Sequence, residues 1–166
     1  MGPRESSVLV DTNVMIEAAR TGIWNALAGG LRIETVEECC VEINTGNNRP
    51  GRTTVDLSRL SEVHGVTALE RAEFGLAYPD AADLDAGERD LMAHAYARSR
   101  QGQLLWSLCS PDRALVRAAV ALDWRERMTS LEKLSSRAGG RPSPPLARQF
   151  TEQWLSECWT DYLLKS

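Results

Sequence analysis

The chain has 166 residues, of which 43% are hydrophobic and 25% charged, a composition that indicates one globular domain and excludes a disordered chain. No apolar run approaches the roughly 20 residues of a membrane-spanning helix, and the segment before Asp11 lacks the features of a secretory signal peptide. The four cysteines show neither a disulfide framework nor the Cys-x-x-Cys spacing of a metal site, so we expect a reduced, cytoplasmic protein with no membrane association.

The net charge of −4 is unevenly distributed along the chain. Residues 1–97 contain 8 basic and 16 acidic side chains, a net charge of −8, whereas residues 98–148 contain 10 basic and 4 acidic ones, a net charge of +6. An acidic segment followed by an arginine-rich one is typical of a metal–carboxylate site beside a phosphate-binding surface. The alternative is that the two kinds of charge simply mix on the folded surface.

The predicted elements alternate between strands and helices from the N-terminus onward. Residues 7–10, Ser-Val-Leu-Val, form a continuous apolar run, typical of a strand buried in a parallel sheet, and Asp11 ends it. Further strands are predicted at 31–34, 63–69, 103–109 and 126–129, and helices at 13–20, 23–27, 36–43, 85–98 and 112–122. This alternation predicts an α/β fold, in which helices cover both faces of a mostly parallel sheet.

Two segments rich in glycine, proline and polar residues define the predicted domain organisation. Residues 44–53 form a predicted exposed loop, and residues 138–145 form a predicted linker between a domain at 1–137 and a C-terminal amphipathic helix at 146–166. Apolar side chains recur in that tail at helical spacing: Phe150, Trp154, Leu155, Cys158, Trp159 and Tyr162. This stripe needs a partner surface, and docking on the domain's own core is favoured over docking on a partner protein.

Four acidic residues stand out by their positions. Asp11 follows the first predicted strand, and Asp112 lies just beyond another; the carboxyl ends of parallel strands meet where such folds bind ligands. Glu42 is embedded among apolar residues of its predicted helix, and Asp90 follows the capping box of residues 85–88. Converging carboxylates repel one another unless a cation is present, and their oxygens suit Mg²⁺ or Mn²⁺. The sequence therefore predicts a divalent-metal site.

These positions and their neighbours resemble the PIN-domain family of metal-dependent nucleases. The resembling motifs are Val8-Leu-Val-Asp-Thr-Asn13, the apolar-flanked Glu42, Gly87-Glu-Arg-Asp-Leu-Met-Ala93 and Ser110-Pro-Asp-Arg-Ala-Leu115, and together they span residues 7 to about 135. The resemblance implies a PIN-like three-layer fold with about five mostly parallel strands, a Mg²⁺ or Mn²⁺ site and hydrolysis of RNA.

The resemblance also implies roles for individual residues. The residues that match the family's catalytic and metal-binding acids are Asp11, Glu42, Asp90 and Asp112. Thr12 and Asn13 match polar positions that support the first acid, and Ser110 lies where the family often has a hydroxyl near the metal.

Two of these assignments leave an alternative open. Glu38 lies one turn before Glu42 on the same helix face and could be the inward acid instead. Glu88 and Asp90 are two positions apart, so they point to nearly opposite sides of a helix and only one can face the site. We assign Asp90, because the capping box that begins at Asp85 already explains Glu88.

Three further residues are weaker candidates for substrate binding. Arg49 and Arg52, in the predicted loop, could contact phosphate, and the alternative is a solvated loop. His94 lies one turn after Asp90 on the same helix face, where it could touch the site or a phosphate. The alternative for His94 is an ordinary surface or packing histidine.

The sequence thus predicts a cytoplasmic Mg²⁺- or Mn²⁺-dependent endoribonuclease that acts on single-stranded RNA. Such an enzyme would be the toxin of a toxin–antitoxin pair, with an antitoxin as its protein partner, or a nuclease of RNA turnover or defence. The alternative from another class is a catalytically inactive PIN-like module that docks a partner through its C-terminal helix. The sequence does not decide between one and two metal ions, between RNA and single-stranded DNA, or whether the chain forms a homodimer.

Overall fold

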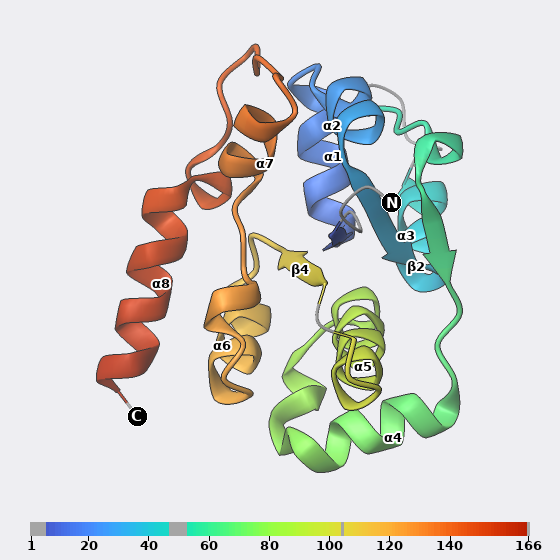
Figure 1. The fold of residues 1–166 in the computed structure, drawn as a ribbon, viewed down its shortest axis with the longest axis vertical. Coiled ribbons are helices and arrows are strands. Elements are labelled where there is room, and N and C mark those ends of the chain that lie inside the picture. Colours follow the sequence, from blue (N-terminus) through green and yellow to red (C-terminus); the bar gives the residue numbers. More distant parts are fainter. Residues whose placement is uncertain (1–5, 47–52, 104, 166) are drawn as a thin grey trace.

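The structure, a computed structural model, describes residues 6–46, 53–103 and 105–165. Its centre is a parallel sheet with the strand order β3-β2-β1-β4 (Figure 1). The strands are β1 (Ser7–Val10), β2 (Arg32–Val36), β3 (Glu62–His64) and β4 (Trp106–Cys109). All four residues of β1 are buried, and successive side chains of a strand point to opposite faces, so both faces of the sheet are covered. The predicted α/β fold is confirmed.

Helices connect the strands and surround the sheet. They are α1 (Thr12–Arg20), α2 (Trp24–Gly30), α3 (Glu37–Gly46), α4 (Ala68–Ala77), α5 (Ala86–Arg100), α6 (Arg113–Ala121), α7 (Leu131–Arg137) and α8 (Glu152–Leu164). Short 3₁₀ segments are η1 (Leu57–Arg59), η2 (Pro79–Asp83), η3 (Arg125–Arg127) and η4 (Arg148–Phe150). The longest helix, α5, packs against β1 and β2. None of the helices described combines the length and the apolar composition needed to cross a membrane.

Two predicted strands differ from the structure. The strand expected at 63–69 exists but is shorter than predicted, because β3 ends at His64 and α4 begins at Ala68. Thr67 starts α4 with a capping box, in which its side chain and that of Glu70 satisfy each other's backbone amides. The strand expected at 126–129 is reduced to one parallel bridge between Leu108 and Met128, so the described sheet has four strands rather than about five.

The C-terminal tail packs on the rest of the chain. Helix α8 contacts α6 and α7, and the apolar side chains buried in the common core include Phe150, Trp154, Leu155 and Cys158. The segment before α8 also packs along α1. The backbone N–H of Ser143 donates to the Thr21 carbonyl (3.0 Å), and that of Ala147 donates to Glu17 Oε1 (2.8 Å). The stripe predicted in the tail therefore docks on the chain's own core.

Candidate functional site

Asp11 lies where β1 ends and α1 begins, and it is only 2% exposed. Its Oδ1 atom accepts a hydrogen bond from the backbone N–H of Val14 (2.9 Å), which caps α1. Its Oδ2 atom accepts a hydrogen bond from the hydroxyl of Ser110 (2.5 Å). Ser110 directly follows β4, and the parallel pairing of Val10 with Cys109 brings the ends of β1 and β4 side by side. The sheet register therefore joins two motifs that lie far apart in the sequence.

Asp112 is connected to Asp11 through Ser110. The backbone N–H of Asp112 donates to Ser110 Oγ (3.1 Å), and Asp112 Oδ1 accepts from the N–H groups of Ala114 (2.7 Å) and Leu115 (3.1 Å), which caps α6. These bonds use one carboxylate oxygen. Within the described part of the chain, the other oxygen has no hydrogen-bond partner. Asp112 therefore has an oxygen available for a ligand beside Asp11.

Glu42 links α3 to the start of α1 and to the start of α5. The hydroxyl of Thr12 donates to Glu42 Oε2 (2.5 Å), and the backbone N–H of Gly87 donates to Glu42 Oε1 (2.9 Å). A Cβ atom at position 87 would lie 2.7 Å from Glu42 Oε1, so this approach requires glycine. The alternative acid, Glu38, lies near Arg71 instead. Asp90 contributes most to the raised pKa of Arg71, and the charge of Glu38 adds to it. The hydrogen bonds thus connect Glu42, and not Glu38, to the segment that contains Asp11.

Glu88 and Asp90 lie on different sides of α5, as their spacing predicts, but the structure brings Glu88 rather than Asp90 to the carboxylates. Asp90 points to α4, where both of its oxygens accept hydrogen bonds from the guanidinium group of Arg71 (2.7 and 2.8 Å). Glu88 is buried, and its pKa is raised first by this burial and then by the negative charges of Asp112, Asp85 and Asp11. The backbone N–H of Asp85 also donates to Glu88 Oε2 (3.2 Å). The capping role therefore does not exclude Glu88 from the site, and the assignment of Asp90 is replaced.

The site is strongly acidic and poorly solvated. Burial, followed by the charges of Asp112 and Asp85, raises the pKa of Asp11 from 3.8 to about 7, although the hydrogen bonds from Ser110 and the Val14 N–H lower it. Burial likewise raises the pKa of Glu88 from 4.5 to about 8, with added repulsion from Asp112, Asp85 and Asp11. Shifts in this direction mark a site where negative charge is costly without a nearby cation.

The donor set fits a hydrated divalent cation. Among the described residues, no arginine or lysine forms an ion pair with any of the four carboxylates, which are Asp11, Glu42, Glu88 and Asp112. Carboxylate oxygens are the ligands that Mg²⁺ and Mn²⁺ prefer. No three of these carboxylates bring oxygen atoms within 4.8 Å of one another in the described chain. Mg²⁺ usually keeps several of its waters and is bound through one or two carboxylates, so a Mg²⁺ site does not require three such oxygens.

The other predicted site residues have different outcomes. Thr12 and Ser110 are hydrogen-bonded to site carboxylates, whereas Asn13 is exposed and lines a small pocket beside Asp112. His94 packs instead against His64, with ring centroids 4.0 Å apart. Burial, together with the charges of His64 and Arg98, lowers the pKa of His94 from 6.5 to about 4. Arg49 and Arg52 lie outside the described residues.

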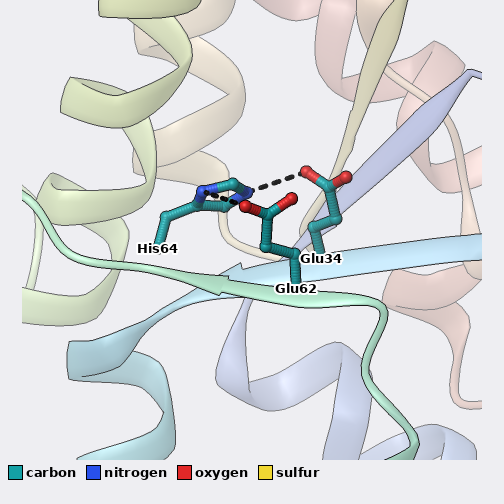
Figure 2. Close-up of side chains that lie close together, drawn as sticks. All are labelled: Glu34, Glu62 and His64. Carbon is teal, nitrogen blue, oxygen red and sulfur yellow. Dashed lines mark hydrogen bonds and ion pairs between the residues drawn. The ribbon is translucent and has the colours of Figure 1, made fainter.

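A second polar cluster, formed by Glu34, Glu62 and His64, was not predicted from the sequence (Figure 2). Figure 2 shows each ring nitrogen of His64 joined to a different carboxylate: Nε2 lies 2.9 Å from Glu34, and Nδ1 lies 3.8 Å from Glu62. One ligand atom of each residue lies within 4.8 Å of the others. By distance alone, these three side chains could bind a metal ion.

Electrostatics argue against a metal ion in this cluster. Glu34 Oε1 accepts from Arg32 Nε (2.6 Å), and Glu34 Oε2 accepts from Arg98 Nη1 (2.9 Å). Burial alone would raise the pKa of Glu34, but the hydrogen bonds from His64 and Arg32 and the charge of Arg98 lower it to about 2. Because Glu34 is already neutralised, a cation would have to displace two guanidinium groups. We interpret the cluster as an ion-pair network around the buried carboxylate of Glu34.

Two residues of the candidate site, Glu88 and Gly87, were missed by sequence reasoning for different reasons. Glu88 was visible as an acid in the motif and was assigned to capping alone, whereas the structure shows that one carboxylate both caps a helix and faces the site. Gly87 has no signal of its own, because its role depends on the approach of Glu42 from α3. Comparisons of the chain with protein-family models, with curated proteins and with solved structures find no match.

Proposed function

We propose that the chain is a metal-dependent endoribonuclease, with a site like that of the PIN-domain nucleases that its motifs resemble. The site residues are Asp11, Glu42, Glu88 and Asp112. The observation that supports the proposal most strongly is the convergence of these carboxylates, from four separate segments, without a basic partner in the described chain. Parallel α/β sheets bind ligands at this edge, beyond the carboxyl ends of their strands.

The chain's own residues fix the positions of the carboxylates before any ligand binds. Ser110 holds Asp11, and Thr12 holds Glu42, each through a hydroxyl that donates a hydrogen bond. Asp11, Glu88 and Asp112 would hold Mg²⁺ or Mn²⁺, with Glu42 beside them. When bound, such a cation activates water and stabilises negative charge on a phosphodiester. Fixed carboxylates lower the reorganisation that this chemistry needs.

RNA is the proposed substrate, and the resemblance implies products with a 5′-phosphate and a 3′-hydroxyl. Single-stranded RNA is favoured, because proteins mostly recognise specific RNA through unpaired nucleotides, whose bases can leave the stack. The proposed roles are those of a toxin controlled by an antitoxin, or of a nuclease in RNA turnover or defence. In either role, access to the acidic site has to be restricted.

A cleavage assay tests the proposal. Single-stranded RNA, and DNA of the same sequence, would be incubated with the full chain in Mn²⁺, in Mg²⁺ and in EDTA. We expect RNA fragments with 3′-hydroxyl ends in either metal, none in EDTA, and at least about a hundredfold loss of rate in Asp11→Asn. The matched control is Glu126→Gln. The Glu126 side chain is 90% exposed and pairs with Arg125 rather than with a residue of the site. Cleavage that persists in EDTA, or an Asp11→Asn variant as active as Glu126→Gln, would contradict the proposal.

The alternative of an inactive module that docks a partner through its C-terminal helix has less support. Trp154, Leu155 and Cys158, the apolar residues that would meet such a partner, are buried in the chain's own core. The acidic set also has no obvious use in such a module, since crowded carboxylates without a ligand destabilise the fold.

A further inference from the structure

A small pocket opens beside Asp112, between α1 and the segment that precedes α8. Its volume is about 350 Å³, and its lining includes Asn13, Ile16, Pro111, Asp112, Gln149 and Phe150. That volume is at the lower end of the roughly 300–1,000 Å³ found for small-molecule pockets. Asp112 is also a member of the carboxylate site, so the pocket borders that site.

The pocket combines apolar walls with two free amides. Ile16, Pro111 and the buried Phe150 provide apolar surface. Asn13 and Gln149 are exposed, and neither side chain forms a hydrogen bond with another residue that the structure describes. Each amide offers one acceptor and two donors, which is the complement of the edge of a nucleobase.

The pocket is attached firmly to the domain. Glu17, which forms part of its lining, accepts a hydrogen bond from the Ala147 backbone N–H (2.8 Å) and pairs with Arg20 (2.7 Å). These contacts join α1 to the segment that contains Gln149. They also neutralise Glu17, so Asp112 provides the remaining negative charge of the lining, at the end nearest the carboxylates.

We propose that this pocket binds one unpaired nucleobase of the RNA next to the phosphate that is cleaved, and that Asn13 and Gln149 determine which base is preferred. The inference rests on the proposed nuclease function, because a phosphate at the carboxylates would bring its own nucleoside to Asp112. A base has to leave its stack to enter a concave pocket of this size, so the strand must be single. The C-terminal segment thereby contributes to substrate recognition as well as to the core.

Two measurements test the pocket, and the first does not require catalysis. Adenosine, guanosine, cytidine and uridine would each be titrated into the ¹⁵N-labelled, metal-free protein. Nucleosides are used because a phosphate would be repelled by the carboxylates. We expect one nucleoside to shift the side-chain amide resonances of Asn13 and Gln149 more than the others do. The side chain of Gln153, which donates to Glu157 on α8, should not respond and serves as the internal control.

The second measurement is the base preference of cleavage, read from the ends of fragments of a random-sequence RNA pool. Gln149→Ala should reduce the preference next to the cut by about fivefold or more, whereas Gln153→Ala should leave it unchanged. Failure of all four nucleosides to shift the Gln149 resonance, with an unchanged preference in Gln149→Ala, would overturn the inference even if the protein cleaves RNA. Conversely, a Gln149 shift in a protein that cleaves no RNA would support a base-binding pocket and reject the proposed nuclease.

Discussion

The guanidinium group of Arg71 donates two hydrogen bonds, of 2.7 and 2.8 Å, to the two oxygens of Asp90 and so holds this carboxylate against α4. Asp90 is thereby committed to joining two helices, and the acid of α5 that faces Asp11 and Asp112 is Glu88. Substitution of Glu88 should therefore affect metal binding, whereas substitution of Asp90 should affect stability.

Glu88→Gln should raise the Mn²⁺ concentration needed for half-maximal cleavage, because a neutral amide is a weaker ligand than a carboxylate. Its carbonyl oxygen can still accept from the Asp85 amide, so the cap of α5 should persist. Asp90→Asn should instead lower the free energy of unfolding by on the order of 1 kcal/mol, since Arg71 is largely exposed and the pair is screened by solvent. Arg71→Gln should lose a similar amount. Both quantities would be measured in one buffer, and an increased metal requirement in Asp90→Asn alone would reject the assignment.

Asp11→Asn should raise the melting temperature of the metal-free protein. The folded-state pKa of Asp11 is about 7 against 3.8 for the ordinary group, so the protonated form stabilises the wild type at low pH. That contribution is fully present below pH 3.8 and is lost as the pH rises through about 7. Asparagine does not titrate, so the variant should become more stable than wild type as the pH rises from 5.5 to 8.5. The difference in free energy of unfolding should reach at least about 1 kcal/mol, or about 2–4 °C in melting temperature. Melting in EDTA at both pH values measures it, and an Asp11→Asn protein less stable than wild type at pH 8.5 would argue against crowded carboxylates.

Gly87→Ala should reduce cleavage by about tenfold or more, because the added Cβ atom would lie 2.7 Å from Glu42 Oε1 and force that carboxylate to move. The matched control is Gly75→Ala in α4, where a Cβ atom meets nothing within 4 Å. This control should be active and more stable, by about 0.5–1 kcal/mol, because alanine favours the helix. Equal rates for the two variants would show that the contact between Glu42 and Gly87 is not needed.

The stacked histidines predict a dependence of stability on pH. Burial lowers the folded-state pKa of His94 from 6.5 to about 4, so its contribution is present above pH 6.5 and is lost as the pH falls through about 4. His94→Phe should therefore lose less stability than wild type between pH 7 and 5, by on the order of 1 kcal/mol once solvent screening is included. Glu34 stays ionised across this range, because its pKa is about 2. An equal loss of stability between pH 7 and 5 in the two proteins, measured by thermal melting, would contradict the buried, uncharged state of His94.

The tail should contribute to stability through its buried residues. Trp154→Ala removes an indole that is 8% exposed and should cost about 3–5 kcal/mol. Leu164→Ala, at a position 81% exposed, should change the free energy of unfolding by no more than about 0.5 kcal/mol. Denaturant unfolding of both variants measures the difference. Similar, small losses would mean that the α8 stripe is not part of the core.

Local patterns in the sequence were sufficient to predict where several residues of the candidate site lie in the fold. Asp11 and Asp112 were predicted correctly to lie at strand ends, and parallel pairing of β1 with β4 brings these ends together. The orientation of α5 could not be predicted, because it depends on contacts across the fold: Arg71 from α4 with Asp90, and Glu42 from α3 with Gly87. The Glu34 network was missed for the same reason, since Arg98 is 64 positions away in the sequence.

Helix α4 was not predicted for a different reason, because the signal for its start is local in the sequence. Thr67 and Glu70 have the spacing of a capping box, but the apolar, β-branched residues from Val63 onward favoured an extended strand in its place. Here the capping interactions determine where the strand ends and the helix begins.

The location of bound Mn²⁺ tests the central claim most directly. Crystals of the full chain would be soaked in a manganese salt, and the anomalous scattering of the metal would be mapped. We predict a peak among the carboxylates of Asp11, Glu88 and Asp112, and its loss in Asp11→Asn crystals. A peak at Glu34, Glu62 and His64, with none at Asp11, would contradict both the proposed metal site and our interpretation of that cluster as an ion-pair network.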